Sequence, residues 1–348
     1  MLKIGVVGCG KITEVRHAPE YAENPAAVVT AWYDAFPEKA SAMAEKFGGK
    51  AFDSVEALLN SGVDAVSVCV ANNAHADVTV QALEAGCHVL CEKPMATTLA
   101  DCERMTAAAQ KAGKRLLLGH NQRFALAHVE ARKMIAAGEI GRVLTFHTMF
   151  GHPGPEGWTG EKNSWFFDKS RAVLGTLADL GIHKTDLIHF LIGQPITQVC
   201  AMLSTADKTY PDGKPVDVDD NALCLYATDQ GVTGQMHVSW TNYGAENNST
   251  QIYGTKGVLR LYDDAEYSLI LERRDGSIEK RQLDEMTSNK QQTSGQRTNT
   301  GVIDEFIRAI LSGEPSVIDA QEALKAMRVI FAAEASAKSG RVIAVKQS

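Results

Sequence analysis

Three residues far apart in the chain have side chains suited to acid–base chemistry on a hydroxyl group. Lys93 follows a short apolar run that predicts a buried strand, and Asp179 and His183 lie four residues apart in a strongly apolar segment. A spacing of four places both side chains on one face of a helix. A histidine titrates near neutral pH, and a lysine can donate to a developing oxyanion. Two structural alternatives remain open, a surface turn at Lys93 and an Asp–His hydrogen bond inside the fold.

A glycine-rich turn near the N-terminus predicts a dinucleotide site. The first predicted strand runs directly into Gly8, Cys9, Gly10, Lys11 and Ile12. Gly8 permits a tight turn, and Gly10 leaves room for a pyrophosphate against backbone N–H groups at the start of a helix. The third glycine position of this fingerprint carries Thr13, which predicts a slightly wider spacing of helix and strand.

The end of the second predicted strand carries the residue expected to select the cofactor. Asp34 lies 24 residues after Gly10, where a carboxylate can accept hydrogen bonds from the adenosine ribose hydroxyls. Its charge repels a 2′-phosphate, and no arginine follows it, so the sequence favours NAD over NADP. The alternative is a solvated aspartate that caps the helix predicted from Pro37.

These residues need a scaffold, and the chain predicts two domains. Up to about residue 120, short β-branched runs alternate with helical segments, which is typical of a doubly wound parallel sheet. We therefore predict a Rossmann domain at residues 1–124. After residue 125, consecutive strand-like segments between 198 and 273 predict an antiparallel or mixed sheet in an α+β domain at 125–348. Few helices follow to cover both faces of that sheet, so we expect one face to meet its copy in a homodimer or homotetramer.

Composition excludes several classes of partner. The net charge is −7 without a block of like charge, and no apolar run approaches the length of a membrane span, so we expect neither nucleic acid nor membrane as a partner. The chain begins without a charged leader, and seven cysteines are an odd count that fits free thiols, so a cytoplasmic location is expected. No metal site is predicted. The acidic segment 217–220 lacks the glycine and distal glutamate of a calcium loop and is expected to be a solvated turn.

The motifs together resemble those of the glucose-fructose oxidoreductase and inositol dehydrogenase family, often written Gfo/Idh/MocA. The resemblance spans nearly the whole chain. It rests on the segments 8–12, 72–75, 85–94, 123–124, 138–141, 179–186 and 253–257. The resemblance implies an N-terminal Rossmann domain and a C-terminal domain whose large, open, mostly antiparallel sheet faces a partner subunit.

The same resemblance assigns roles to individual residues. By position, Lys93 matches the catalytic lysine of the family, Asp179 its substrate-binding carboxylate and His183 its acid–base histidine. The further candidates for cofactor binding are Asn72, His75 and Glu92. The further candidates for substrate binding are Arg123 and Trp165. Trp165 lies in a loop rich in Gly, Pro and Trp, where its ring either stacks on a sugar or packs the loop.

Residues and resemblance together predict an NAD-dependent dehydrogenase that oxidises a secondary hydroxyl of a sugar, glycoside or cyclic polyol to the ketone. In this hypothesis His183 removes the hydroxyl proton, hydride passes to the nicotinamide, and Lys93 stabilises the oxyanion. Asp179 fixes a neighbouring hydroxyl. The alternatives are a non-catalytic NAD-binding sugar sensor or repressor of the same fold, and a reductase of another small carbonyl compound. The presence of Lys93, Asp179 and His183 together argues against both.

Overall fold

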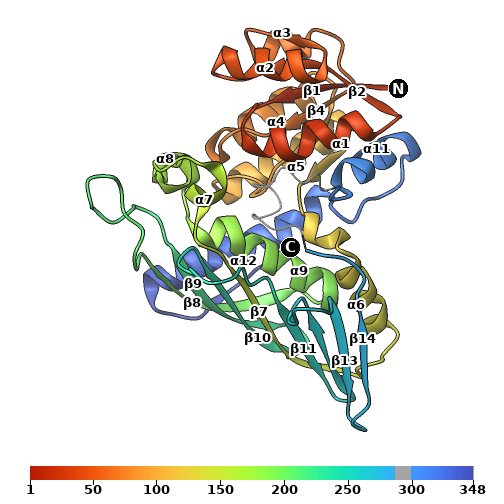
Figure 1. The fold of residues 1–348 in the computed structure, drawn as a ribbon, viewed down its shortest axis with the longest axis vertical. Coiled ribbons are helices and arrows are strands. Elements are labelled where there is room, and N and C mark those ends of the chain that lie inside the picture. The colour runs from red at the N-terminus through yellow and green to blue at the C-terminus, as the bar shows by residue number, and fades with distance from the viewer. Residues whose placement is uncertain (287–298, 348) are drawn as a thin grey trace. The chain divides into compact units, whose positions relative to one another are not determined.

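The chain forms two compact units in a computed structural model that describes residues 1–286 and 299–347 (Figure 1). The first unit contains Met1–Asn121 and the described part of Asn289–Leu324. The second contains the described residues of Gln122–Ser288 and Lys325–Ser348. The chain therefore leaves the first unit after Asn121 and later returns to it. On its return, the Ile318 carbonyl accepts a hydrogen bond from the backbone N–H of Leu118, at 2.9 Å.

The first unit is built on a parallel six-stranded sheet with the strand order β3-β2-β1-β4-β5-β6. Its strands are β1 (Leu2–Val7), β2 (Ala27–Tyr33), β3 (Lys50–Ala51), β4 (Ala65–Val68), β5 (His88–Cys91) and β6 (Leu116–Leu118). Every residue of β4 and β6 is buried, as expected for strands covered on both faces. The order reverses between β1 and β4, which is the point where ligands of such sheets bind. The predicted Rossmann sheet is confirmed.

The first unit also contains a series of helices, most of which connect these strands. They are a π-helical turn (Thr13–His17), α1 (Ala18–Glu23), α2 (Pro37–Phe47), α3 (Val55–Leu59), α4 (His75–Glu84), α5 (Leu99–Ala112) and α11 (Val302–Ser312). The Thr98 hydroxyl accepts a hydrogen bond from the Asp101 N–H at the start of α5, and Gly113 ends this helix in the left-handed conformation.

The second unit is built on a nine-stranded sheet in the order β14-β13-β12-β11-β7-β10-β9-β8-β15. The strands are β7 (Val143–Gly151), β8 (Ile196–Ser204), β9 (Asn221–Thr228), β10 (Thr233–Ser239), β11 (Thr250–Gly254), β12 (Gly257–Leu261), β13 (Leu269–Arg273), β14 (Ile278–Arg281) and β15 (Ile343–Ala344). Only the β7–β10 pair among the described strands of this sheet is parallel. The predicted large, mostly antiparallel sheet is confirmed.

Two long helices cover one face of this sheet, α9 (Ile182–Ile192) and α12 (Ala320–Ser339) (Figure 1). A third helix, α6 (Leu126–Ala136), packs against α9. Every residue of α9 is buried, so its polar residues lie inside the fold. The opposite sheet face carries exposed apolar side chains, with Met202 at 73%, Leu223 at 42% and Leu225 at 55% exposure. Within residues 1–286 and 299–347, no helix is both long and apolar enough to cross a membrane.

Candidate active site

The glycine turn after β1 has one glycine that the backbone requires and one that it does not. Gly8 has a φ of +96°, and a Cβ there would lie 2.3 Å from the Cys69 carbonyl oxygen. A side chain at Gly8 is therefore excluded by the chain itself. A Cβ at Gly10 would meet nothing within 4 Å, so the space beside Gly10 is open. Lys11 follows, its ammonium group 3.3 Å from the Glu14 carboxylate, and Ile12 directly precedes the π-helical turn.

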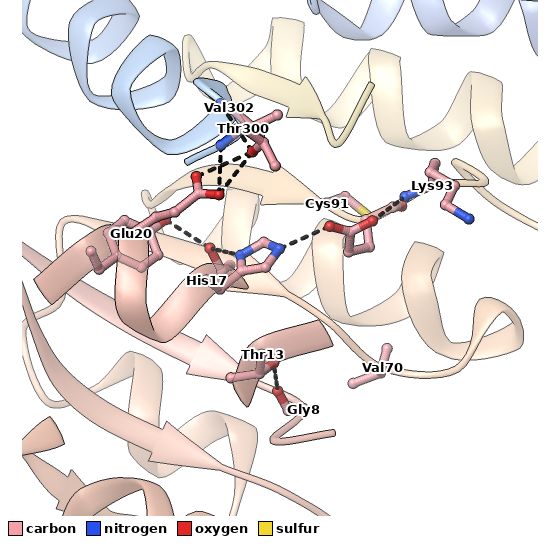
Figure 2. A network of polar contacts seen from close by, with 12 residues as sticks. Gly8, Thr13, His17, Glu20, Val70, Cys91, Lys93, Thr300 and Val302 are labelled. Carbon is pink, nitrogen blue, oxygen red and sulfur yellow. Dashed lines mark hydrogen bonds and ion pairs between the residues drawn. The ribbon is translucent and has the colours of Figure 1, made fainter. Parts of the chain in front are cut away.

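Thr13, at the third glycine position of the fingerprint, is fully buried. Its hydroxyl donates to the Gly8 carbonyl at 2.6 Å (Figure 2). The following turn is a π-helix, Thr13–His17. The threonine thus ties the glycine turn to the helix that follows it, which is a contact that glycine could not make.

Asp34 directly follows β2 and is held against the glycine turn. Its Oδ2 accepts a hydrogen bond from the Cys9 backbone N–H at 2.6 Å, and its Oδ1 accepts one from the Phe36 N–H at 2.9 Å. The N-cap residue of α2 is Phe36, without a side-chain cap. The structure therefore places the Asp34 carboxylate against the glycine turn. Its second contact, with the Phe36 N–H, lies just before α2 and does not cap this helix.

The turn that carries Lys93 is hydrogen-bonded to one member of a charged pair, His17 and Glu92. Glu92 follows β5, and its Oε2 accepts a hydrogen bond from the Lys93 backbone N–H at 3.2 Å. Its Oε1 lies 2.9 Å from Nε2 of His17 (Figure 2). The other His17 nitrogen lies 3.2 Å from the Ser67 hydroxyl, which in turn lies 2.7 Å from the Tyr21 hydroxyl. A chain of polar contacts thus runs from helix α1 across β4 to Lys93.

The two side chains of this pair shift each other's pKa. Burial opposes a charge on His17, but the neighbouring Cys69 and the hydrogen-bonded Glu92 carboxylate favour the protonated ring, and the pKa of His17 is raised well above its usual value. Burial also opposes a charge on Glu92, but His17 outweighs it, with Arg16 and Lys93 adding to the effect, and the pKa of Glu92 is lowered to about 2. Both are therefore charged at neutral pH. Sequence analysis missed His17, because no spacing rule connects it to a partner 75 residues away.

A second histidine holds the other side of the same turn. His75 begins α4 and is 1% exposed, with Nδ1 2.8 Å from the Pro94 carbonyl oxygen and Nε2 3.1 Å from that of Val70. Burial lowers the pKa of His75, so the neutral ring donates from one nitrogen. The predicted cofactor candidate therefore contacts the backbone on both sides. Asn72, the other candidate of this segment, is buried in the short 3-10 helix Asn72–Ala74.

In the second unit, Asp179 and His183 lie on consecutive helical turns. Asp179 belongs to the π-helical turn Leu177–Gly181, and His183 belongs to the first turn of α9. Each is 7% exposed. The Asp179 Oδ2 accepts a hydrogen bond from the indole Nε1 of Trp240 at 3.1 Å, and the His183 ring lies 6.0 Å from the Phe150 ring. The predicted helical placement is thus present, with a π-turn under Asp179 that sequence analysis did not predict.

The two substrate candidates, Arg123 and Trp165, both make contacts within the second unit. The buried guanidinium of Arg123 donates from Nε and Nη2 to the two carboxylate oxygens of Asp186, each at 2.7 Å, which anchors the segment before α6 to α9. Trp165 is half-buried and stacks on Phe166, with ring centroids 4.1 Å apart. Trp165 thus packs on a neighbouring residue of its loop and Arg123 forms a buried ion pair, while contact of either residue with a substrate stays a prediction.

The acidic segment 217–220 differs from its prediction. Asp219 and Asp220 are 8% and 0% exposed, so the expected solvated turn is wrong for these two residues. Their carboxylates accept hydrogen bonds from backbone N–H groups of other segments. Within the described parts of the chain, no group of three or more His, Cys, Asp or Glu residues is arranged to hold a metal ion.

Two family models match most of the chain. Residues 2–120 match the model described as "Oxidoreductase family, NAD-binding Rossmann fold". Residues 128–260 match the model of the "GFO/IDH/MocA C-terminal domain". The two matches correspond to the parallel sheet and to most of the strands of the nine-stranded sheet.

Characterised proteins are similar at moderate identity. A 1,5-anhydro-D-fructose reductase of Ensifer adhaerens is 34% identical over 64% of each chain. A myo-inositol 2-dehydrogenase of Thermotoga maritima is 26% identical over 99% of each. The solved structure of levoglucosan dehydrogenase in complex with NADH and levoglucosan superposes with a TM-score of 0.86 at 25% identity over the full length of both chains. The chain belongs to the Gfo/Idh/MocA family of oxidoreductases.

Proposed function

We propose that the protein is an NAD-dependent dehydrogenase that oxidises a secondary hydroxyl of a sugar, glycoside or cyclic polyol to the ketone. The observation that carries this proposal is the Lys93 turn. It lies at the carboxyl end of β5, in the type of parallel sheet that binds dinucleotides at this edge, and the His17–Glu92 pair and His75 hold it from two sides. Relatives named for oxidation of inositol and levoglucosan support the substrate class.

The residues of the first unit fit the cofactor. The open space at Gly10 leaves room for a pyrophosphate to approach the backbone there, and Asp34 is fixed beside that turn by the Cys9 N–H. A carboxylate in this place favours the ribose hydroxyls of NAD over the 2′-phosphate of NADP. When bound, NAD supplies the hydride acceptor at the nicotinamide C4 atom.

The side chains have separate tasks in the proposed reaction. His183 takes the proton of the reacting hydroxyl, and Lys93 stabilises the negative charge that develops on its oxygen. Asp179, oriented by the Trp240 indole, accepts a hydrogen bond from a neighbouring hydroxyl so that one C–H bond faces the cofactor. Asn72 contributes to the nicotinamide side of the site. His75, Glu92 and Arg123 act by holding backbone and helices in place, which their buried contacts support.

A substrate screen tests the proposal. The protein is incubated with NAD and a panel of inositols, glucose, glucosides, levoglucosan and sugar phosphates, and NADH is followed by its absorbance. We expect NADH formation with at least one member of the panel. A protein that binds NAD but oxidises none of them would instead support a sensor or repressor. The similarity to a 1,5-anhydro-D-fructose reductase makes NADH consumption with that ketose the second assay, because it would reveal a reductase.

We also propose a homodimer or homotetramer that forms through the open face of the nine-stranded sheet. Met202 and Leu223 are register partners on neighbouring strands, and Leu225 lies two residues further along the same face. All three side chains are exposed, and burial of such a cluster against its copy would remove apolar surface from water. A cytoplasmic location is proposed as well, supported by seven cysteines that are all free thiols.

A further inference from the structure

Two neighbouring carboxylates are buried at the start of β9, in the second unit. Asp219 is 8% exposed and Asp220 is fully buried. Burial of a carboxylate is costly unless hydrogen-bond donors surround it. Each of these residues meets that need with backbone N–H groups of a different segment, so each one attaches a separate stretch of chain to the start of β9.

Asp219 holds the start of the helix that carries Asp179. Its Oδ1 accepts a hydrogen bond from the Gly175 N–H and its Oδ2 accepts one from the Leu177 N–H, each at 2.8 Å. Its backbone carbonyl accepts from the N–H of Thr176 at 2.9 Å and from the Thr176 hydroxyl at 3.1 Å. The first N–H groups of a helix have no hydrogen-bond acceptors within the helix, and Asp219 provides acceptors for them here. Four hydrogen bonds thus attach three consecutive residues, ending two positions before Asp179, to a single aspartate.

The close approach of these segments depends on a glycine. A Cβ at Gly175 would lie 1.9 Å from the Asp219 carbonyl oxygen and 3.0 Å from its backbone nitrogen. Any other residue would push the helix start away from Asp219. The contact is therefore backbone against backbone, which leaves little freedom in the position of the helix.

Asp220 fixes the other partner of Asp179. Its carboxylate accepts hydrogen bonds from the N–H groups of Ala206, Asp207 and Lys208 at 2.7 to 2.9 Å. Its backbone carbonyl accepts from the Trp240 N–H at 2.8 Å. The Trp240 indole in turn donates to Asp179. The helix under Asp179 and the indole that touches its carboxylate are consequently both attached to the dipeptide Asp219–Asp220.

We infer that Asp219 is a positioning residue, which sets the orientation of the Asp179 carboxylate through the start of its helix. The inference rests on the substrate-binding role proposed for Asp179. A carboxamide at position 219 would keep the shape but present an NH2 group to one of the two backbone N–H donors, so one hydrogen bond would be lost. The helix start would then shift, and a misplaced orienting group lowers the rate of the reaction.

A double-mutant cycle on the full-length protein tests this inference. Asp219→Asn, Asp179→Asn and the double variant are compared for kcat/KM with the best substrate of the panel, together with NAD affinity and melting temperature. We expect each single variant to lose roughly 10- to 100-fold in kcat/KM with NAD affinity unchanged, and the double variant to lose little more than Asp179→Asn alone. Asp217→Asn is the matched control, because Asp217 is exposed and its carboxylate accepts a hydrogen bond from the Tyr210 hydroxyl, away from Asp179. This variant should keep wild-type kinetics.

The outcomes separate the inference from the proposed function. Full activity of a folded Asp219→Asn protein would overturn the inference, and so would losses that multiply in the double variant, since a general structural defect acts independently of Asp179. An Asp179→Asn protein with wild-type activity would overturn the role proposed for Asp179 instead. If Asp219→Asn does not fold, Thr176→Val, which removes only the hydroxyl contact with Asp219, replaces it in the same cycle. Thr176→Val should lose less kcat/KM than Asp219→Asn, and in the Asp179→Asn background it should cause no further loss. A further loss of kcat/KM in that background would refute the inference.

Discussion

Removal of the His17 ring should destabilise the first unit, because it breaks a buried ion pair. The ring lies 2.9 Å from Glu92, and the two side chains are 3% and 12% exposed. His17→Ala would leave an ionised carboxylate in a buried place without its charged partner. The same carboxylate accepts the N–H of Lys93, so the loss reaches the turn on which the proposed chemistry depends.

The pKa of Glu92 gives the order of magnitude, since its shift combines the effect of His17 with those of burial, Arg16 and Lys93. It falls from the usual 4.5 to about 2, a difference of about 2.5, and each pKa unit corresponds to about 1.4 kcal/mol. The folded state thus favours the ionised Glu92 by about 3 kcal/mol, which agrees with the ~3–5 kcal/mol typical of a broken buried ion pair. Because the pKa is lowered, this contribution is complete above pH 4.5 and is lost as the pH falls toward 2.

Urea unfolding followed by circular dichroism measures the effect in the wild type, His17→Ala, Glu92→Gln and the double variant at pH 7. We expect each single variant to lose about 3 kcal/mol and the double variant to lose at least about 1 kcal/mol less than the sum. Lys133→Ala is the control, since Lys133 is 71% exposed and lies 3.7 Å from Glu130; it should change little. Additive losses, or a His17→Ala protein as stable as the wild type, would refute the reasoning.

Three further predictions concern the cofactor, the oligomer and the buried Asp219. Asp34→Ser with Ala35→Arg should shift the kcat/KM ratio of NAD to NADP at least about tenfold toward NADP, because a repulsive charge is exchanged for an attractive one; an unchanged ratio would contradict the role of Asp34. Leu225→Asp should convert the oligomer to monomers in light scattering at micromolar concentration, and a monomeric wild type would exclude the proposed interface. Burial raises the pKa of Asp219 from 3.8 to about 6, so its protonated form stabilises the fold below pH 3.8 and this contribution is lost as the pH rises through 6. Urea unfolding should show that the wild type loses about 2 kcal/mol more than Asp219→Asn between pH 4 and 7, and parallel curves would contradict this.

The fold was largely predictable because each strand carries its own signal. Apolar runs separated by helical segments predict a parallel sheet, and consecutive strands after residue 198 predict an antiparallel one. The parallel pairing of β7 with β10 was not predictable, since it depends on which strands meet rather than on their composition. The return of residues 299–324 to the first unit was not predictable for the same reason. Ile318 contacts Leu118, which lies about 200 residues earlier in the chain.

The site was predictable only where its chemistry is local. Gly8 and Asp34 follow from the geometry of a turn and a strand end. His17 and Glu92 are 75 residues apart in the sequence, and Asp219 and Gly175 are 44 residues apart. No spacing rule predicts contacts over such separations. Asp219 was predicted to lie in a solvated turn because a run of acidic residues is normally exposed to solvent. Its compensating donors are backbone N–H groups, which every sequence contains.

The turnover of Lys93→Ala tests the central claim most directly. The variant is assayed with saturating NAD and the best substrate, and its melting temperature and NAD affinity are measured on the same preparation. If Lys93 acts at the reacting oxygen, kcat should fall by roughly two to four powers of ten while the protein stays folded and binds NAD as the wild type does. A folded, NAD-binding Lys93→Ala protein with full activity would contradict the account.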